Sequence, residues 1–234
     1  MRNLCFSMLA AVGAVSFTLQ TLAAPPPQSA SDEARLNNQP FVTSSVDEMA
    51  SEFDGARESF LNIDGAAAAL RIRRAIARMQ EAAQDATEGG RTAINKSRHE
   101  LELLAQAVEQ RRVASVRSLD EAFARANDTL AQNHLLLAIR AQNQQARQRI
   151  GEELNSAIGH FQQGRQRLGQ NLRQDEQELV TNTRRLAGNL IHGMGATADE
   201  IGQGIRSFGQ RLEQAQAADS DSQTRQSATT GISR

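Results

Sequence analysis

Five successive stretches of eleven residues fill the region from Ile158 to Leu212: IGHFQQGRQRL (158–168), GQNLRQDEQEL (169–179), VTNTRRLAGNL (180–190), IHGMGATADEI (191–201) and GQGIRSFGQRL (202–212). Each stretch ends in Leu or Ile. Eleven residues make about three turns of α-helix, so positions repeated at this interval stay near one face of a helix. The region therefore predicts a long amphipathic helix, which we place at 149–212.

The apolar positions of this repeat form a stripe, here called the repeat column, which we predict to be a partner or lipid contact surface. Its members are Ile158, Phe161, Leu168, Leu172, Leu179, Leu190, Ile201, Ile205 and Leu212. Glycines between Gly151 and Gly209 lower the intrinsic stability of the helix, so it needs a surface to pack on. That surface is the chain's own N-terminal helices, another copy of the chain, or a membrane or apolar particle. A fold-back is expected at Gly151 or at Gly193-Met194-Gly195, because a straight helix of this length is unusual.

The preceding residues predict several shorter helices. Ser45-Val46-Asp47-Glu48 and Ser118-Leu119-Asp120-Glu121 have the spacing of capping boxes, and Asp64 can cap a helix between them. Gly89-Gly90 is expected to end that middle helix. Apolar residues spaced by three and four follow each start, and short connections favour antiparallel neighbours. The fold class predicted is all-α, an antiparallel helical bundle at 44–148 followed by the repeat helix.

The N-terminus has the pattern of a secretory signal peptide. Arg2 precedes an apolar run from Leu4 to Leu19, and small residues follow at Ala23 and Ala24. We therefore expect a signal peptide at 1–23, a flexible linker at 24–43 rich in Pro, Ser and Gln, and a disordered tail at 213–234. Lys96 is the single lysine beside many arginines, a usage typical of GC-rich bacterial genomes. The predicted location is the periplasm or the outside of a bacterium.

Composition excludes several classes of function. The chain has 26 basic and 27 acidic residues, and this balance argues against nucleic acid as a partner. Cys5, the single cysteine, lies in the predicted signal, so the mature chain has no thiolate nucleophile or disulfide. Aromatic residues make up 3% of the chain, without Trp or Tyr, which is typical of helical bundles rather than folds with a closed pocket. We expect neither an enzyme nor a small-molecule substrate.

No motif predicts a cofactor or a metal. His99-Glu100 begins like the zinc-protease motif, but Leu103 occupies the position of the second histidine. His134, His160 and His192 are far apart in sequence and lack acidic companions at helical-turn spacing. These histidines are therefore interpreted as surface or helix-seam residues, and no catalytic, cofactor or metal residue is assigned.

One helix carries a cluster of basic side chains outside its apolar seam: Arg71, Arg73, Arg74 and Arg78. Guanidinium groups crowded on one face can bind lipid phosphates or an acidic partner. The simpler interpretation is a solvated helix face. We keep anion contact at these four residues as a hypothesis.

The eleven-residue period over 158–212 is similar to that of the amphipathic repeats of exchangeable apolipoproteins and of late embryogenesis abundant proteins. This resemblance implies an amphipathic helix with a lipid-binding or stress-protectant role. The stretches Asn62–Ala67 and Ala122–Ala126 resemble exported bacterial helical proteins, which implies architecture but no activity. No functional residue is transferred from these likenesses.

The sequence thus favours an exported, non-enzymatic structural or interaction protein of the cell envelope, acting through helix–helix association with itself or another helical protein. The alternatives are a peripheral membrane-surface binding module, in which the repeat column enters the headgroup region, and a chaperone-like stress protectant.

Overall fold

The structure is a computed structural model that describes residues 45–113 and 115–230, the last twelve of these without their side chains. The predicted signal peptide at 1–23 and linker at 24–43 lie outside the described residues. The described residues all belong to one compact unit. Within its described part, no helix combines the length and the apolar character needed to span a bilayer.

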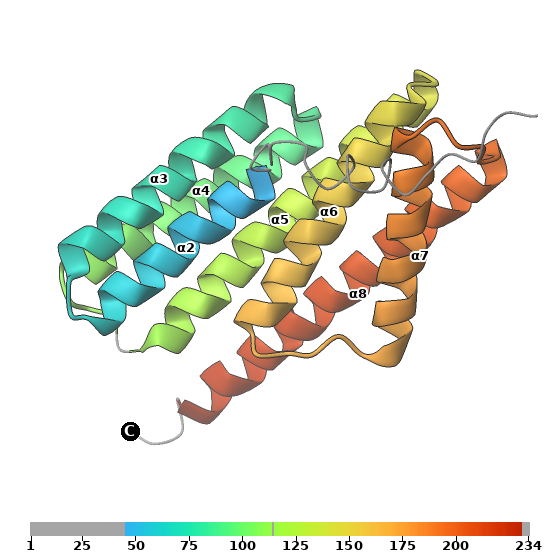
Figure 1. Cartoon of the computed structure of the whole chain (residues 1–234). Helices are drawn as coiled ribbons and strands as arrows, with labels where there is room; N and C mark the ends of the chain where they lie inside the picture. Colours follow the sequence, from blue (N-terminus) through green and yellow to red (C-terminus); the bar gives the residue numbers. More distant parts are fainter. Residues whose placement is uncertain (1–44, 114, 231–234) are drawn as a thin grey trace, which may run out of the picture. The chain divides into compact units, whose positions relative to one another are not determined.

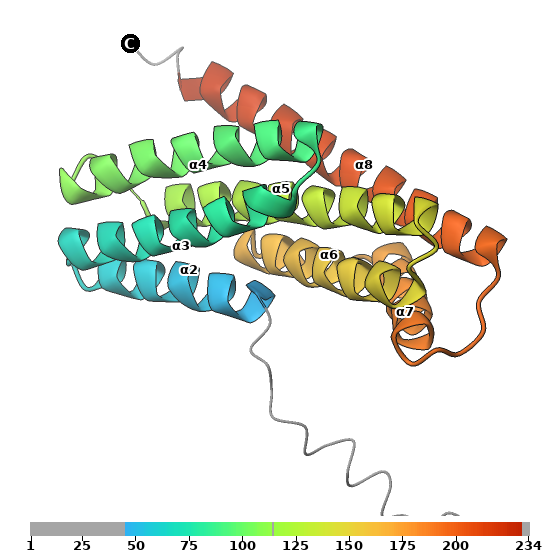
Figure 2. The same cartoon turned by 90° about the horizontal axis from the view of Figure 1, so that it is seen from above.

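The described residues form helices and no strands, which confirms the all-α prediction (Figure 1). In chain order, the helices are α2 (Ser45–Leu61), α3 (Gly65–Asp85), α4 (Glu88–Glu109), α5 (Val116–Asn143), α6 (Arg147–Arg167), α7 (Gln174–Ile191) and α8 (Ala198–Thr230). In the series from α2 to α6, a short connection links each helix to the next, and consecutive helices pack on each other. Helix α6 also contacts α2, and α8 lies against α5 and α7 (Figures 1 and 2).

Local capping sets the limits of α3 and α4. Asp64 caps α3 as predicted, because its side chain accepts a hydrogen bond from the amide of Ala67 at 2.9 Å. Gly89-Gly90, in contrast, does not end a helix. The pair lies in the first turn of α4, where the Thr87 hydroxyl accepts from the amide of Gly90 at 3.1 Å. A Cβ at position 90 would lie 2.5 Å from Oδ1 of Asn133, so glycine allows α5 to approach α4 closely.

A single long helix at 149–212 is not confirmed, because the repeat is divided among α6, α7 and α8. Gly169 and Gly193 follow the ends of α6 and α7 with φ of 66° and 69°. The amide of Gln170 donates to the carbonyl of Arg165 at 3.0 Å, and that of Met194 to Asn189 at 2.8 Å. This is the Schellman arrangement, in which a left-handed glycine closes a helix and satisfies its last carbonyl groups.

A capping box begins the last helix. The amide of Thr197 donates to the Glu200 carboxylate at 2.7 Å, and the amide of Glu200 donates to the Thr197 hydroxyl at 3.2 Å. Helix α8 continues to Thr230 through most of the range predicted to be a disordered tail. Leu212 and Ala215 are buried, so packing on the rest of the unit supports the helix beyond the repeat.

Two apolar cores share α5. The first contains residues of α2, α3 and α4 with the N-terminal half of α5 as far as Leu130. The second contains the other half of α5, from Ala131, with residues of α6, α7 and α8. The predicted boundary at 148–149 lies inside α6, next to the short connection from α5, and does not separate two compact units.

We predict opposite effects of alanine at two helical glycines. At Gly151 a Cβ would lie 2.6 Å from the carbonyl oxygen of Ala187, so Gly151→Ala should push α6 from α7 and cost about 1–3 kcal/mol of unfolding free energy. Gly188 has no neighbouring atom within 4 Å of such a Cβ, so Gly188→Ala should stabilise by about 0.4–1 kcal/mol. Urea unfolding of both variants measures the difference.

This pair also tests the role of Gly151, which the sequence suggested as a fold-back point. Gly151 is buried inside α6 instead. Equal stabilisation by alanine at both glycines would contradict the close approach of α6 and α7.

Candidate functional site

The repeat column is divided between the interior and the surface. Six members are at most 4% exposed and lie in the second core: Ile158, Phe161, Leu190, Ile201, Ile205 and Leu212. Leu168, Leu172 and Leu179, from the end of α6 to α7, are half-buried. The chain's own helices therefore occupy most of the predicted contact surface.

Three of the four arginines in the predicted anion-contact cluster form ion pairs. Arg71 binds Glu52 at 3.2 Å and Arg73 binds Glu109 at 2.8 Å. Arg78 contacts Glu48 and Glu81 at 3.3 and 3.4 Å. Arg74 is exposed and has no ion pair within the described part of the chain. Carboxylates from neighbouring helices thus neutralise much of this surface.

His134 and His160, interpreted from the sequence as surface or helix-seam residues, lie between α5 and α6 with polar partners that the sequence did not indicate. His134 Nδ1 lies 2.8 Å from the Glu153 carboxylate, and His160 Nδ1 lies 3.0 Å from Oδ1 of Asn127. The two imidazole rings stack with centroids 5.5 Å apart. Burial, with a smaller contribution from the charge of His134, lowers the pKa of His160 to about 3, so His160 is neutral near pH 7.

The α5–α6 turn explains why these pairs were missed. Gln145 takes φ of 57°, and the amide of Ala146 donates to the carbonyl of Ala141 at 3.0 Å. The same hydrogen bond closes helices that end in a left-handed glycine. Here the left-handed residue is glutamine, and no glycine or proline in the turn marks the helix end in the sequence. Once the turn is known, antiparallel register brings His134 opposite Glu153 and His160 opposite Asn127.

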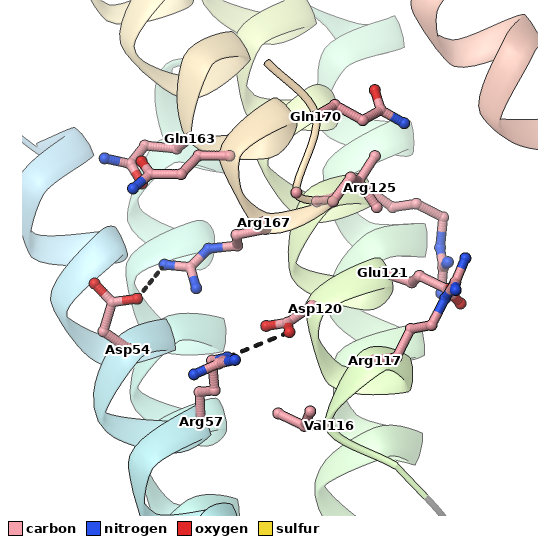
Figure 3. Close-up of a pocket in the computed structure, with 14 residues that line it drawn as sticks. Asp54, Arg57, Val116, Arg117, Asp120, Glu121, Arg125, Gln163, Arg167 and Gln170 are labelled. Atoms are coloured by element: carbon pink, nitrogen blue, oxygen red, sulfur yellow. Dashed lines mark hydrogen bonds and ion pairs between the residues drawn. The ribbon is translucent and has the colours of Figure 1, made fainter.

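A polar hollow of about 770 Å³ lies among α2, α5, the C-terminal end of α6 and the residues that follow it (Figure 3). Its guanidinium groups come from Arg57, Arg117, Arg125 and Arg167, its carboxylates from Asp54, Asp120 and Glu121, and its amides from Gln163, Gln166 and Gln170. Positive charge exceeds negative charge by one. Most residues of this hollow were not singled out from the sequence, because they lie on three separate helices.

Arg167 lies at the buried side of this hollow. Its side chain is 5% exposed, and its guanidinium lies 5.3 and 5.7 Å from the ring centroids of Phe53 and Phe123. One Nη atom donates to the carbonyl of Ala50 at 3.2 Å and lies 3.0 Å from the Asp54 carboxylate. Burial lowers the pKa of Arg167 below its ordinary value, whereas Asp54 opposes that shift. Arg167 is therefore a positioned cation that lies against the stacked pair of Phe53 and Phe123, whose ring centroids are 4.3 Å apart.

One further ion pair and two buried polar atoms lie at or beside Arg167. Arg57 binds Asp120 at 3.3 Å, linking α2 to α5. Oδ1 of Asp120 and Nε of Arg167 are buried and have no hydrogen-bond partner among the described residues. These two buried atoms belong to side chains that line the hollow (Figure 3).

The described side chains contain no group of three or more His, Cys, Asp or Glu residues placed to hold a metal ion.

Comparisons with protein-family models, curated proteins and solved structures give no match to the chain.

Proposed function

We propose that this chain is an exported, non-enzymatic structural or interaction protein of a bacterial envelope that acts through helix–helix association. The burial of six members of the repeat column in the second core carries the proposal. An eleven-residue period keeps apolar side chains on one helix face, and here that face packs against helices. In this proposal the antiparallel bundle of α2 to α5 supports α6 and α8, and α7 packs on those two helices.

Association with a second copy or another helical protein would use the half-buried end of the repeat column. Leu168, Leu172 and Leu179 keep part of their apolar surface in water, and covering that surface stabilises a contact by about 25 cal/mol per Å². They follow one another from the end of α6 into α7. These three leucines therefore replace the whole column as the proposed partner contact.

We expect Leu172→Asn with Leu179→Asn to weaken self-association about tenfold, because both changes remove apolar area from the proposed contact. Light-scattering mass over a range of concentrations measures the effect. Circular dichroism should show that the helices persist, since neither leucine is fully buried. Thr181→Asn, at an exposed position of α7, is the matched control. A single mass for the wild type and the double variant at every concentration would contradict the proposal.

The second candidate is a module that binds a membrane surface. The connections at 168–173 and 192–197 divide the apolar face into three amphipathic helices, and swinging α7 outward would offer its leucines to lipid. Flotation with anionic vesicles distinguishes the two functions. Lipid-dependent flotation that the double leucine variant abolishes supports the membrane function, whereas its absence in the wild type excludes it.

A further inference from the structure

The buried guanidinium of Arg167 forms its ion pair with a carboxylate that is largely exposed to solvent. Among the described residues its one carboxylate partner is Asp54, whose side chain is 70% exposed, whereas that of Arg167 is 5% exposed. A solvated carboxylate gains little from a surface ion pair and can turn into water at low cost. The guanidinium of Arg167 cannot turn into water with Asp54, because it is held by contacts with Phe53, Phe123 and the carbonyl of Ala50. Asp54 is therefore the displaceable member of the pair.

Arg57 provides a second cation for the same position. It approaches from α2 and lies near enough to Arg167 for their mutual repulsion to lower the pKa of Arg167 slightly. Figure 3 shows both guanidinium groups pointing into the space between α2 and the pair α5 and α6. Asp120, which pairs with Arg57 at 3.3 Å and raises the pKa of Arg167, already offsets part of this repulsion. An anionic group between the two guanidinium groups would offset more of it and accept charge-assisted hydrogen bonds from both.

The other polar groups of the hollow can bind uncharged polar groups of a ligand in addition to its anionic group. Asp120 has a carboxylate oxygen without a hydrogen-bond partner among the described residues, and this oxygen accepts from hydroxyl or amino donors. Three glutamine amides line the wall: Gln163, Gln166 and Gln170. The oxygen of Gln170 already accepts from Arg165 at 3.2 Å, so this side chain offers chiefly its amide donors. The cavity volume of about 770 Å³ lies in the range of small-molecule sites.

We propose that this hollow binds a small carboxylate that carries hydroxyl groups, such as a hydroxy acid or a sugar acid. The ligand carboxylate displaces Asp54 and lies between Arg167 and Arg57. Its hydroxyl groups contact the amides and, after a small rotation of the side chain, Asp120. This inference goes beyond the proposed helix association and does not depend on it.

Isothermal titration of the purified full-length chain tests the proposal. The probes are gluconate and citrate, with glucose as the neutral counterpart and inorganic phosphate as the other anion. We expect saturable binding of gluconate or citrate and none of glucose. Phosphate that binds more tightly than both carboxylates, or no saturation by either carboxylate, would overturn the assignment.

Three variants separate a binding site from a purely structural ion pair. Asp54→Asn removes the competing carboxylate and should tighten carboxylate binding several-fold, while Arg57→Gln should weaken it about tenfold through loss of a charge-assisted hydrogen bond. Arg78→Gln, on α3 outside the hollow, should leave affinity unchanged. Weaker or unchanged binding in Asp54→Asn, or equal losses in Arg57→Gln and Arg78→Gln, would overturn the proposal. Thermal unfolding confirms that each variant is folded.

Discussion

Lowering the pH from 7 to 4 is expected to reduce the free energy of unfolding by roughly 3 kcal/mol through His160 alone. The pKa of His160 is about 3 in the folded chain, against 6.5 for an unperturbed histidine. Between these values the unfolded chain binds a proton that the folded chain does not. The stabilisation is therefore present above about pH 6.5 and is lost as the pH falls toward 3.

The surroundings of His160 give no compensation for a positive charge. On α5, Asn127 accepts through a neutral amide, and His134 stacks on the ring and repels a proton when charged. Glu153, on α6, binds His134 at 2.8 Å instead. Protonation of His160 would thus place a cation in the interior between the two helices.

Urea unfolding at several pH values measures this dependence, and two glutamine variants isolate it from carboxylate titration. His160→Gln keeps a side-chain donor for Asn127 and should flatten the slope between pH 6 and 4 by about 1.4 kcal/mol per pH unit. His99→Gln changes an exposed histidine of α4 and should retain the wild-type slope. The same slope in His160→Gln and the wild type would contradict a neutral, buried His160.

Replacement of Asp128 by Asn should reduce the free energy of unfolding by about 3–5 kcal/mol. Asp128 and Arg165 join α5 to α6 at 2.8 Å, with side chains 6% and 5% exposed. Arg165 also donates to Gln170 at 3.2 Å and lies over Phe161. The variant leaves a buried guanidinium without this carboxylate, and water cannot solvate the charge.

A double replacement separates loss of the ion pair from damage to packing. Asp128→Leu with Arg165→Met removes both charges and should recover most of the stability lost in Asp128→Asn. Glu121→Gln breaks the exposed pair with Arg117 at 2.9 Å and should cost at most about 0.5 kcal/mol. Thermal unfolding compares the three variants. A cost for Asp128→Asn as small as that for Glu121→Gln would show that the buried pair is not needed.

Helix ends show how far the sequence could predict this fold. Asp64 was identified as a cap because a carboxylate before an apolar helical pattern pairs with the free amides of a first turn. The triplet Gly193-Met194-Gly195 was among the expected fold-back points, and α7 ends just before it. Gln145, Arg111 and Ile63 take positive φ without being glycine, so those helix ends carry no comparable signal.

The candidate sites were harder to predict from the sequence than the helices. The hollow combines Asp54 and Arg57 of α2 with Asp120 of α5 and Arg167 of α6, and nothing in their spacing relates them. The interior pairs depend on the register of α5 and α6, which a turn centred on Gln145 sets. The interpretation of the histidines as surface or helix-seam residues therefore did not name their partners.

The sequence by itself determined the all-α class and the apolar face of residues 158–212, because a period of eleven residues specifies side-chain direction around a helix. It also located the local start of α3 at Asp64, since a capping bond joins neighbours in the chain. Tertiary structure alone decided that six residues of the repeat column lie in an intramolecular core and that Arg167 is buried beside an exposed Asp54. Those outcomes depend on which helix faces meet, and that depends on turns and packing between residues far apart in sequence.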